Sequence, residues 1–286
     1  DKLEANFNDF ILERYMIALW QPIMQSLVDA IGAKTILEVG AESGLSTKVL
    51  LDYVKGVGGH LHSIDPAPDF STDDLAQNHP EALTFYRELS LDAIPKLPRI
   101  AVALLDGDHN WYTVLNELRL LENLHNANPC QMPLIFLHDI GWPYARRDLY
   151  YAPETIPEKH RNPYAKLGMG RLKKKLLESG GLNATLHNAL TEGGPHNGVL
   201  TGLEDYLRES KLNFLFMNLP LYFGLGVLVT QERIAANSSL KTELAKLKTY
   251  LAGEKLIDLT ERFRLKTVAQ LQSLQLELAE ARTNVA

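Results

Sequence analysis

A short apolar run followed by two spaced glycines constrains this chain more than any other feature. Apart from Glu38, residues 35–39 are apolar or β-branched, which is typical of a strand buried on both faces. Gly40 and Gly44 follow, and a helix can begin directly after them. Because glycine lets the backbone approach a ligand where a Cβ would collide, this pattern predicts a ligand-binding turn.

The spacing of the glycines excludes two common nucleotide-binding loops. A dinucleotide fingerprint has the pattern G-x-G-x-x-G, but Glu42 stands two residues after Gly40, and its carboxylate would repel a pyrophosphate. A phosphate-binding loop needs Gly-Lys-Ser or Gly-Lys-Thr, and neither tripeptide occurs. The acid Glu38 at the end of the run instead favours a ligand that is cationic and zwitterionic.

A second predicted strand, residues 60–65, also ends in an acid. At a neighbouring strand tip, Asp65 can accept two hydrogen bonds from a ribose diol. The pattern Glu38-x-Gly40-x-x-x-Gly44 together with Asp65 resembles the class I S-adenosylmethionine (SAM)-dependent methyltransferases. The alternative is a strand, turn and helix whose glycines only close the turn.

The resemblance implies a binding site for each part of SAM. The first motif would pass under the methionyl part, Asp65 would hold the ribose, and Ser90 would contact the adenine. The residues that it assigns to the cofactor are Glu38, Gly40, Gly44, Ser46, Asp65, Ser90 and Asp106.

Composition and charge restrict the partners. The chain has 286 residues, of which 45% are hydrophobic, so it can bury a substantial core. A net charge of -6 without a dense basic run argues against binding to nucleic acid. The apolar stretch 212–230 is interrupted by Asn, Pro and Gly, so it predicts two strands joined by a turn instead of a membrane span.

The single cysteine and the first residues of the sequence give an indication of the cellular compartment. Cys130 excludes an internal disulfide and a cysteine-based zinc site, and no signal peptide is visible, which together predict a cytoplasmic protein. The sequence begins with Asp1 instead of Met, which leaves open that it is part of a longer polypeptide.

Predicted strands and helices alternate from residue 33, which is the pattern of an α/β fold with a parallel sheet and with ligands at the carboxyl ends of strands. We expect a Rossmann-like methyltransferase fold with a seven-stranded, mostly parallel sheet and a terminal antiparallel hairpin. The strands are expected at 35–39, 60–65, 83–88, 100–105, 134–138, 213–217 and 224–230. The helices are expected at 45–55, 72–78, 111–125 and 203–210, with a helical turn at 91–97.

We expect three parts along the chain. Residues 1–32 form a helical cap, residues 33–235 form the methyltransferase domain, and residues 239–286 form a helical tail. Within the domain, residues 141–198 are too long for a plain connector and are interpreted as a lid. Leucines in the tail are spaced by three and four residues, from Leu240 to Leu251 and from Leu271 onward. This spacing predicts either a coiled coil, joining copies or a larger polypeptide, or a helix folded back on the domain.

Acidic and imidazole side chains follow two of the predicted strands. Asp106, Asp108 and His109 come after the strand at 100–105, and His138 and Asp139 end the strand at 134–138. Because neighbouring parallel strands bring their tips together, these groups form a candidate site for Mg²⁺, Mn²⁺ or a similar cation. The alternative for Asp108 and His109 is a structural role at the start of the helix at 111.

Over residues 33–230 the chain resembles metal-dependent O-methyltransferases, and most of all a bacterial branch related to cephalosporin hydroxylase-like proteins. The resemblance implies that Asp106, His138 and Asp139 hold the metal. His138 departs from the carboxylate or amide usual in that group, and an imidazole favours Mn²⁺ or Fe²⁺ over Mg²⁺. His109 is the first candidate for the catalytic base and His138 the second.

The lid offers aromatic rings and guanidinium groups that suit a saccharide or a carboxylated acceptor. The residues concerned are Trp142, Tyr144, Arg146 and Arg147. The alternative is an ordered structural loop in which Arg147 pairs with Asp148 or Glu154.

The sequence therefore predicts a SAM-dependent enzyme that methylates a hydroxyl of a small metabolite or saccharide, assisted by a divalent metal. One alternative is a metal-dependent hydroxylase on the same fold, in which His109, His138 and Asp139 form an iron-binding triad. Another is a non-catalytic scaffold that assembles through residues 239–286.

Overall fold

A seven-stranded sheet with the order β3-β2-β1-β4-β5-β10-β9 organises the computed structural model, which describes residues 16–253, 256, 259–260 and 267. The first five strands along the chain are parallel, and β9 and β10 form an antiparallel hairpin whose β10 pairs with β5. This is the predicted seven-stranded, mostly parallel sheet with a terminal antiparallel hairpin. The strands are β1 (Thr35–Val39), β2 (His60–Ile64), β3 (Leu83–Tyr86), β4 (Val102–Leu105), β5 (Leu134–Leu137), β9 (Phe214–Leu219) and β10 (Leu225–Thr230).

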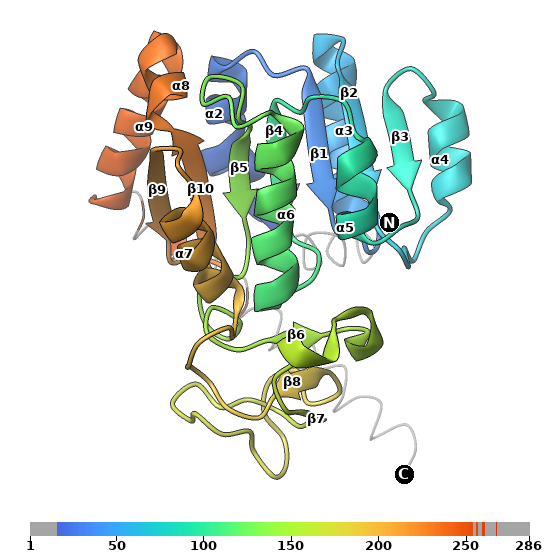
Figure 1. Ribbon diagram of the computed structural model, residues 1–286. Coiled ribbons are helices and arrows are strands. Elements are labelled where there is room, and N and C mark those ends of the chain that lie inside the picture. The colour runs from blue at the N-terminus through green and yellow to red at the C-terminus, as the bar shows by residue number, and fades with distance from the viewer. Residues whose placement is uncertain (1–15, 254–255, 257–258, 261–266, 268–286) are drawn as a thin grey trace, which may run out of the picture.

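Helices cover both faces of the sheet (Figure 1). One face carries η1 (Met16–Leu19), η2 (Trp20–Met24), α2 (Gln25–Ala30), α3 (Leu45–Val57) and α9 (Ser238–Leu251), and the other carries α5 (Ser90–Ala93), α6 (Trp111–Leu124) and α7 (Val199–Glu209). Side chains alternate between the faces, as Ile36 and Leu37 do in β1. Burial on both faces explains the apolar runs in the sequence. The remaining short helices of this part are α4 (Thr72–Asn78), η3 (Ile94–Lys96) and α8 (Gln231–Ala236).

The helix α7 begins four residues before its predicted start, and two glycines explain the difference. Gly198, with φ of +93°, precedes the helix, and Gly202 lies within it. A Cβ at Gly202 would lie 3.0 Å from the carbonyl oxygen of Trp111. Glycine at this position therefore allows close packing of α7 on α6 and does not end the helix.

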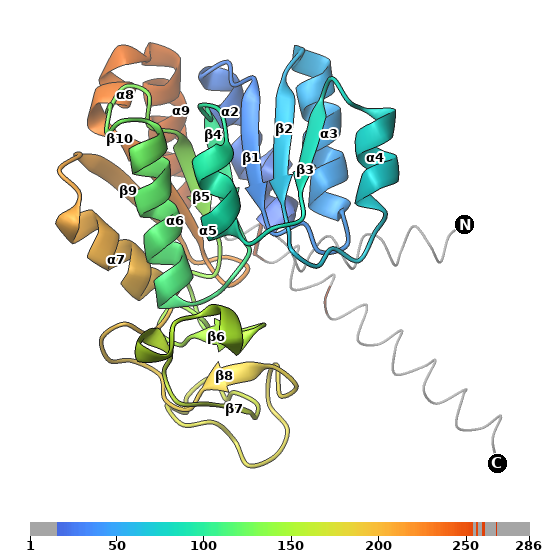
Figure 2. The same ribbon diagram turned by 45° about the vertical axis from the view of Figure 1, so that its right-hand side comes forward.

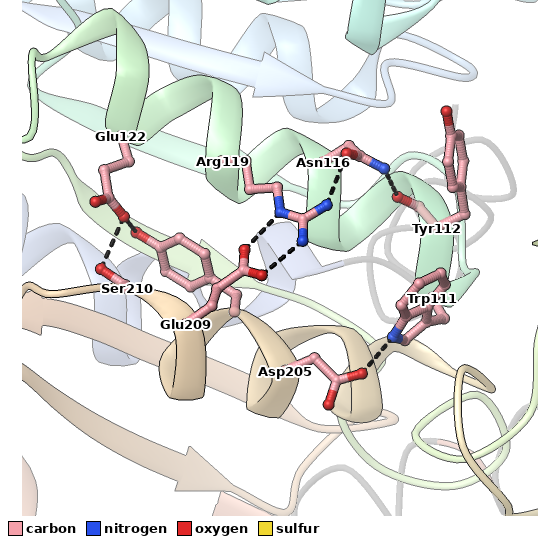
Figure 3. Close-up of polar contacts among 9 residues, drawn as sticks. Trp111, Tyr112, Asn116, Arg119, Glu122, Asp205, Glu209 and Ser210 are labelled. Carbon is pink, nitrogen blue, oxygen red and sulfur yellow. Dashed lines mark hydrogen bonds and ion pairs between the residues drawn. The ribbon is translucent and has the colours of Figure 1, made fainter.

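Polar side chains also fasten α7 to α6 (Figure 3). Arg119 pairs with both carboxylate oxygens of Glu209, at 2.5 and 2.6 Å. Nearer the start of α6, Trp111 donates its indole N–H to Asp205 at 2.7 Å. Because α7 follows residues 141–198 directly, these contacts hold the end of that segment against the sheet.

Residues 141–198, which we call the insertion, lie beyond the carboxyl ends of the parallel strands (Figures 1 and 2). They contain a small antiparallel sheet with the order β6-β8-β7, which the sequence did not predict. Its strands are β6 (Leu149–Tyr150), β8 (His187–Ala189) and β7 (Tyr164–Lys166), and two short 3₁₀ helices, η4 (Pro153–Thr155) and η5 (Glu158–His160), separate β6 from β7.

The chain ends contribute to one face of the sheet. Residues from Met16 to Val28 cover that face, and residues 1–15 of the predicted helical cap lie outside the described part. The first leucine run of the tail does not form a coiled-coil seam, because Leu240, Leu244 and Leu247 are buried in the same core. The second run, from Leu271, lies outside the described residues. Among the helices that the structure describes, none is long and apolar enough to cross a membrane.

Candidate active site

The tips of β1 and β4 form a switch point in the sheet. From β1 the chain continues to β2 and β3 on one side, and from β4 it continues to β5 on the other, so a crevice opens at these two tips. Gly40 has φ of +90°, and a Cβ there would lie 2.2 Å from the carbonyl oxygen of Asp106. Glycine is therefore required where the β1 turn passes over the end of β4.

A cavity of about 280 Å³ occupies this switch point, and we call it the larger cavity. Of the residues predicted to hold the cofactor, five line it: Gly40, Ser46, Asp65, Ser90 and Asp106. Glu42, Asp108 and Tyr151 are among its other lining residues. Gly44 has φ of +76° before α3, where a Cβ would lie 3.0 Å from the ring of Phe70. Its role is to shape the turn.

Asp65 holds the turn after β1 from the neighbouring strand tip. One carboxylate oxygen accepts the backbone N–H groups of Ala41 and Glu42 at 2.9 and 2.8 Å, and the other accepts that of Ala67 at 2.8 Å. A carboxylate has about four acceptor sites, so these three bonds leave capacity for a ligand hydroxyl. Asp65 therefore both shapes the cavity and faces it.

Glu38 lies beneath the turn and does not line the cavity, which corrects the predicted direct contact with the ligand. One of its carboxylate oxygens accepts the hydroxyls of Thr47 at 2.7 Å and Ser63 at 2.5 Å. Burial raises the pKa of Glu38 to about 7, and the two hydroxyls counteract only part of this rise. The side chain thus ties β1, α3 and β2 together below the crevice.

Ser90 begins α5 at the far wall of the larger cavity, and behind it lies a buried acid that sequence analysis missed. The Ser90 hydroxyl faces the carboxyl group of Glu117, on α6, one oxygen of which has no hydrogen-bond partner among the described residues. Burial raises the pKa of Glu117 to about 8, so this acid is mostly protonated at neutral pH. It lies within the apolar stripe of α6, where nothing in the sequence marks it.

A second cavity, of about 150 Å³, adjoins the tips of β4 and β5, and we call it the smaller cavity. His138 Nδ1 lies 2.9 Å from a carboxylate oxygen of Asp106 and 3.1 Å from one of Asp139. His109 Nε2 lies 3.1 Å from the same Asp139 oxygen and 3.5 Å from Asp106. The structure therefore brings together all four residues that the sequence proposed for metal binding and base catalysis.

Mutual charge explains the titration of this cluster. Burial would lower the pKa of His138, but Asp106 and Asp139 outweigh it and raise that pKa well above its usual value. Burial would also lower the pKa of His109, but Asp139 and then Asp106 outweigh it and raise that pKa above its usual value. For Asp106, burial would raise the pKa, but His138 and His109 lower it. Without a metal, the cluster therefore favours imidazolium groups paired with carboxylates.

The donor set fits a divalent cation. Asp106, His138 and Asp139 each offer one ligand atom, and these three atoms lie within 4.8 Å of one another. Among the described residues, Nε2 of His138 and Nδ1 of His109 have no hydrogen-bond partner, and Nε2 of His109 meets the two carboxylates only as an ion pair. Two carboxylates with imidazole suit Mn²⁺ or Fe²⁺, whose charge can replace that of the imidazole protons.

Of the four predicted acceptor contacts in the insertion, only Tyr144 lines a cavity. Its ring stacks on that of His109, with centroids 5.5 Å apart and planes 15° apart. Its hydroxyl is held by Asn183 at 2.7 Å and Asn188 at 3.2 Å. Trp142 instead contacts the guanidinium of Arg171, 5.5 Å above its ring.

The two predicted guanidinium contacts are used within the protein and line neither cavity. Arg146 pairs with both carboxylate oxygens of Glu204 on α7, at 2.6 Å each. Arg147 is 1% exposed and donates to the backbone carbonyls of Ala189 and Lys174. The first carbonyl lies at the end of β8 and the second in the loop before that strand, and Arg147 satisfies both. Among the described residues Arg147 pairs with neither Asp148 nor Glu154, the partners that the ordered-loop alternative predicted.

Asp148 anchors the insertion, which sequence analysis missed. It is fully buried and accepts the backbone N–H groups of Trp111 at 2.8 Å and Gly198 at 2.7 Å. It also accepts the Tyr150 hydroxyl at 2.7 Å and the side-chain amide of Asn162 at 2.8 Å. This carboxylate thus joins both ends of the insertion to the first turn of α6, where the helix dipole also favours negative charge.

Three residues line both cavities, namely Glu42, Asp106 and Tyr151. The sequence marked Asp106 as shared between cofactor and metal, but Glu42 served there only to exclude other loops. Its position two residues after Gly40 is the signal that could have placed it in the site. Tyr151 lies in a segment without periodicity, and nothing in the sequence distinguishes it from neighbouring tyrosines.

Comparison with known proteins supports the class I methyltransferase resemblance. Residues 37–140 match a family described as "Methyltransferase domain", and this range includes the turn after β1 and the tips of β4 and β5. A search of curated protein sequences found no match.

Similar solved structures include a methyltransferase from Podospora anserina with bound S-adenosylhomocysteine (SAH). It is 11% identical, the match covers 73% of this chain and 77% of that one, and the TM-score is 0.44. Another is the 1,6-didemethyltoxoflavin-N1-methyltransferase of Burkholderia thailandensis, at 15% identity, with 80% and 88% covered and a TM-score of 0.39. At these scores the structural likeness carries no argument about activity, which has to come from the site.

Proposed function

We propose that this chain is a SAM-dependent O-methyltransferase that acts on a hydroxyl of a small metabolite or saccharide. One observation carries the proposal: the larger cavity at the switch point and the smaller carboxylate–imidazole cavity share three lining residues. A donor in the first and an acceptor in the second would have their reacting atoms side by side. Such alignment is worth a large part of the barrier to a bimolecular reaction.

The larger cavity offers a place for each part of SAM. Asp65 would bind the ribose, Ser90 would face the adenine, and Gly40 and Ser46 would lie along the methionyl part. Carboxylates of Glu42 and Asp106 at the junction of the cavities favour a positively charged ligand. Glu38 and Gly44 would act indirectly, by shaping the turn.

The reaction would be a direct transfer to oxygen. SAM supplies a methyl group on a positively charged sulfur. The acceptor oxygen forms a bond to this methyl carbon while the sulfur–carbon bond breaks and its electron pair stays on sulfur, which leaves SAH. The hydroxyl proton passes to a base, for which His109 is the first candidate and His138 the second.

Asp106, His138 and Asp139 would hold the divalent cation. When bound, it would lower the pKa of the acceptor hydroxyl and balance the charge of the two carboxylates. The neighbouring ring of Tyr144 keeps the imidazole of His109 in a fixed orientation and excludes water from one of its faces. Tyr144 and Phe223 would supply apolar walls for a ring-shaped acceptor.

The test is production of SAH from SAM in the presence of Mn²⁺ and a panel of catechols and monosaccharides. We expect methylation of at least one acceptor, its loss on chelation, and a loss of at least about 100-fold in Asp106→Ala, because a carboxylate at the junction of donor, acceptor and metal is removed. Asp73→Ala, on the exposed side of α4, is the matched control and should retain full activity.

A second candidate is a metal-dependent hydroxylase on the same fold. The observation that favours it is the meeting of two imidazoles with one carboxylate, since His109 and His138 each lie 3.1 Å from the same oxygen of Asp139. Such a set is typical of non-haem iron oxygenases. Oxygen uptake with Fe²⁺ and 2-oxoglutarate, without any need for SAM, would favour it over methyl transfer.

A further inference from the structure

Tyr151 stands where the two cavities meet. It follows β6 and lines both cavities, and of the three residues that do so it is the one contributed by the insertion. The preceding residue, Tyr150, is buried and donates its hydroxyl to Asp148, whereas Tyr151 remains 54% exposed. A large aromatic side chain left open at this place is available to a ligand.

Contacts of the preceding residues hold the ring of Tyr151 close to His109. The backbone N–H of Leu149, two residues earlier, donates to the carbonyl of His109 at 2.9 Å. The rings of Tyr151 and His109 have centroids 5.8 Å apart, at an angle of 59°. Asp148 fixes the same segment to the first turn of α6. The insertion therefore presents Tyr151 from a rigid support instead of a loose lid.

The surroundings of Tyr151 are negatively charged. Asp139 lines the smaller cavity, and Glu42 and Asp106 line both cavities together with Tyr151. Among the described residues its hydroxyl has no hydrogen-bond partner. The face of an aromatic ring attracts a cation, and nearby carboxylates strengthen the preference for positive charge.

We propose that the ring of Tyr151 packs against the sulfonium end of SAM and directs its methyl group towards the smaller cavity. This inference rests on the proposed function. Its consequence concerns product release as well as alignment: after transfer the sulfur of SAH is neutral, so the attraction to the ring is lost. Tyr151 would therefore make the larger cavity prefer the charged donor to the spent product.

The test is calorimetric titration of SAM and of SAH into the wild-type protein and three variants. Tyr151→Ala should weaken SAM binding by about 5- to 30-fold and SAH binding by no more than about twofold, because a cation over an aromatic face contributes in that range. Tyr151→Phe keeps the ring and should bind both ligands within about twofold of wild type. Tyr164→Ala, which removes a tyrosine of β7 that lines neither cavity, is the control and should leave both affinities unchanged.

The outcomes separate this inference from the function on which it rests. Equal weakening of SAM and SAH in Tyr151→Ala, or no weakening of either, overturns the role of the ring while SAM binding itself stands. Failure of the wild-type protein to bind SAM overturns both. If Tyr151→Ala proves unfolded by circular dichroism, Tyr151→Leu keeps the bulk without the π face and should show the same selective loss of SAM affinity.

Discussion

The two halves of the candidate active site are built on different physical grounds. The walls that come from residues 35–108 follow buried strands, whose apolar side chains alternate between two faces of one sheet. The wall that comes from the insertion rests on short strands and on buried polar side chains such as Asp148 and Arg147. The first half is specified locally by periodicity, whereas the second is specified by contacts between residues far apart in sequence.

The largest effect should follow the loss of Asp148. Asp148→Ala leaves four donors without an acceptor, at a cost of about 1–3 kcal/mol each, so the insertion should be destabilised by about 5 kcal/mol. Hydrogen exchange should show the amides of Trp111 and Gly198 losing protection by about 1,000-fold or more.

The same experiment tests the contrast between the two halves. Amides of β1 and β4 should keep their protection in Asp148→Ala, because the sheet does not depend on this carboxylate. If amides of the sheet and of the insertion lost protection from exchange equally, the stability of the sheet would depend on the insertion, contrary to our expectation. Glu204→Gln, which weakens the partly exposed pair with Arg146, is the matched control and should change little.

A smaller but still severe effect is expected at the switch point of the sheet. Gly40→Ala would place a Cβ 2.2 Å from a backbone oxygen at φ of +90°, and we expect a loss of about 3 kcal/mol in the free energy of unfolding. Gly58→Ala is the control, since φ is +62° there but nothing lies within 4 Å of the added carbon. Urea denaturation should show a loss of about 1 kcal/mol in the control; similar losses in both variants would argue against a close approach of β1 and β4.

Because Glu38 is buried, the stability of the half of the site that is built on the sheet should depend on pH. Its pKa is raised from 4.5 to about 7 in the folded protein, first by burial and then by Asp65 and Asp106, against the hydroxyls of Ser63 and Thr47. For a raised pKa, the contribution to stability is complete below pH 4.5 and is lost as pH rises through about 7.

The loss should amount to about 3 kcal/mol in the free energy of unfolding. Glu38→Gln, which still accepts hydrogen bonds but does not titrate, should lack it. We would compare urea denaturation of the two proteins between pH 4 and pH 8. A constant difference between them across this range would show that Glu38 does not carry the pH dependence.

The smallest effect is expected on the surface of the α6–α7 contact (Figure 3). Arg119 and Glu209 are 44% and 39% exposed, so Arg119→Ala should cost less than about 1 kcal/mol despite the paired geometry. Trp111→Phe removes the hydrogen bond to Asp205, which is less exposed than Glu209. It should therefore lower the free energy of unfolding by more than Arg119→Ala does. Thermal denaturation in low and high salt would separate the two, since only the Arg119 contribution should fall with salt.

The sequence allowed prediction of the sheet, its hairpin and most helix bounds to within a few residues, because apolar periodicity and glycine positions are local signals. It also placed the four groups of the smaller cavity, since acids and imidazoles after neighbouring parallel strands must converge. It did not reveal that Glu38 lies beneath the turn, because a strand tip can direct its acid into the crevice or under it. Nor did it give the roles of Asp148, Arg147 and Tyr151, which depend on contacts within a segment without periodicity.

Calorimetric titration of SAM into the wild-type protein and into Asp65→Ala, first with Mn²⁺ and then with a chelator, would show whether the larger cavity binds SAM. We expect micromolar binding to the wild type in both conditions and a loss of at least about 10-fold in the variant, because the carboxylate proposed to bind the ribose is removed. If the wild-type protein binds no SAM with or without the metal, it is not a SAM-dependent enzyme, and the non-catalytic scaffold is favoured.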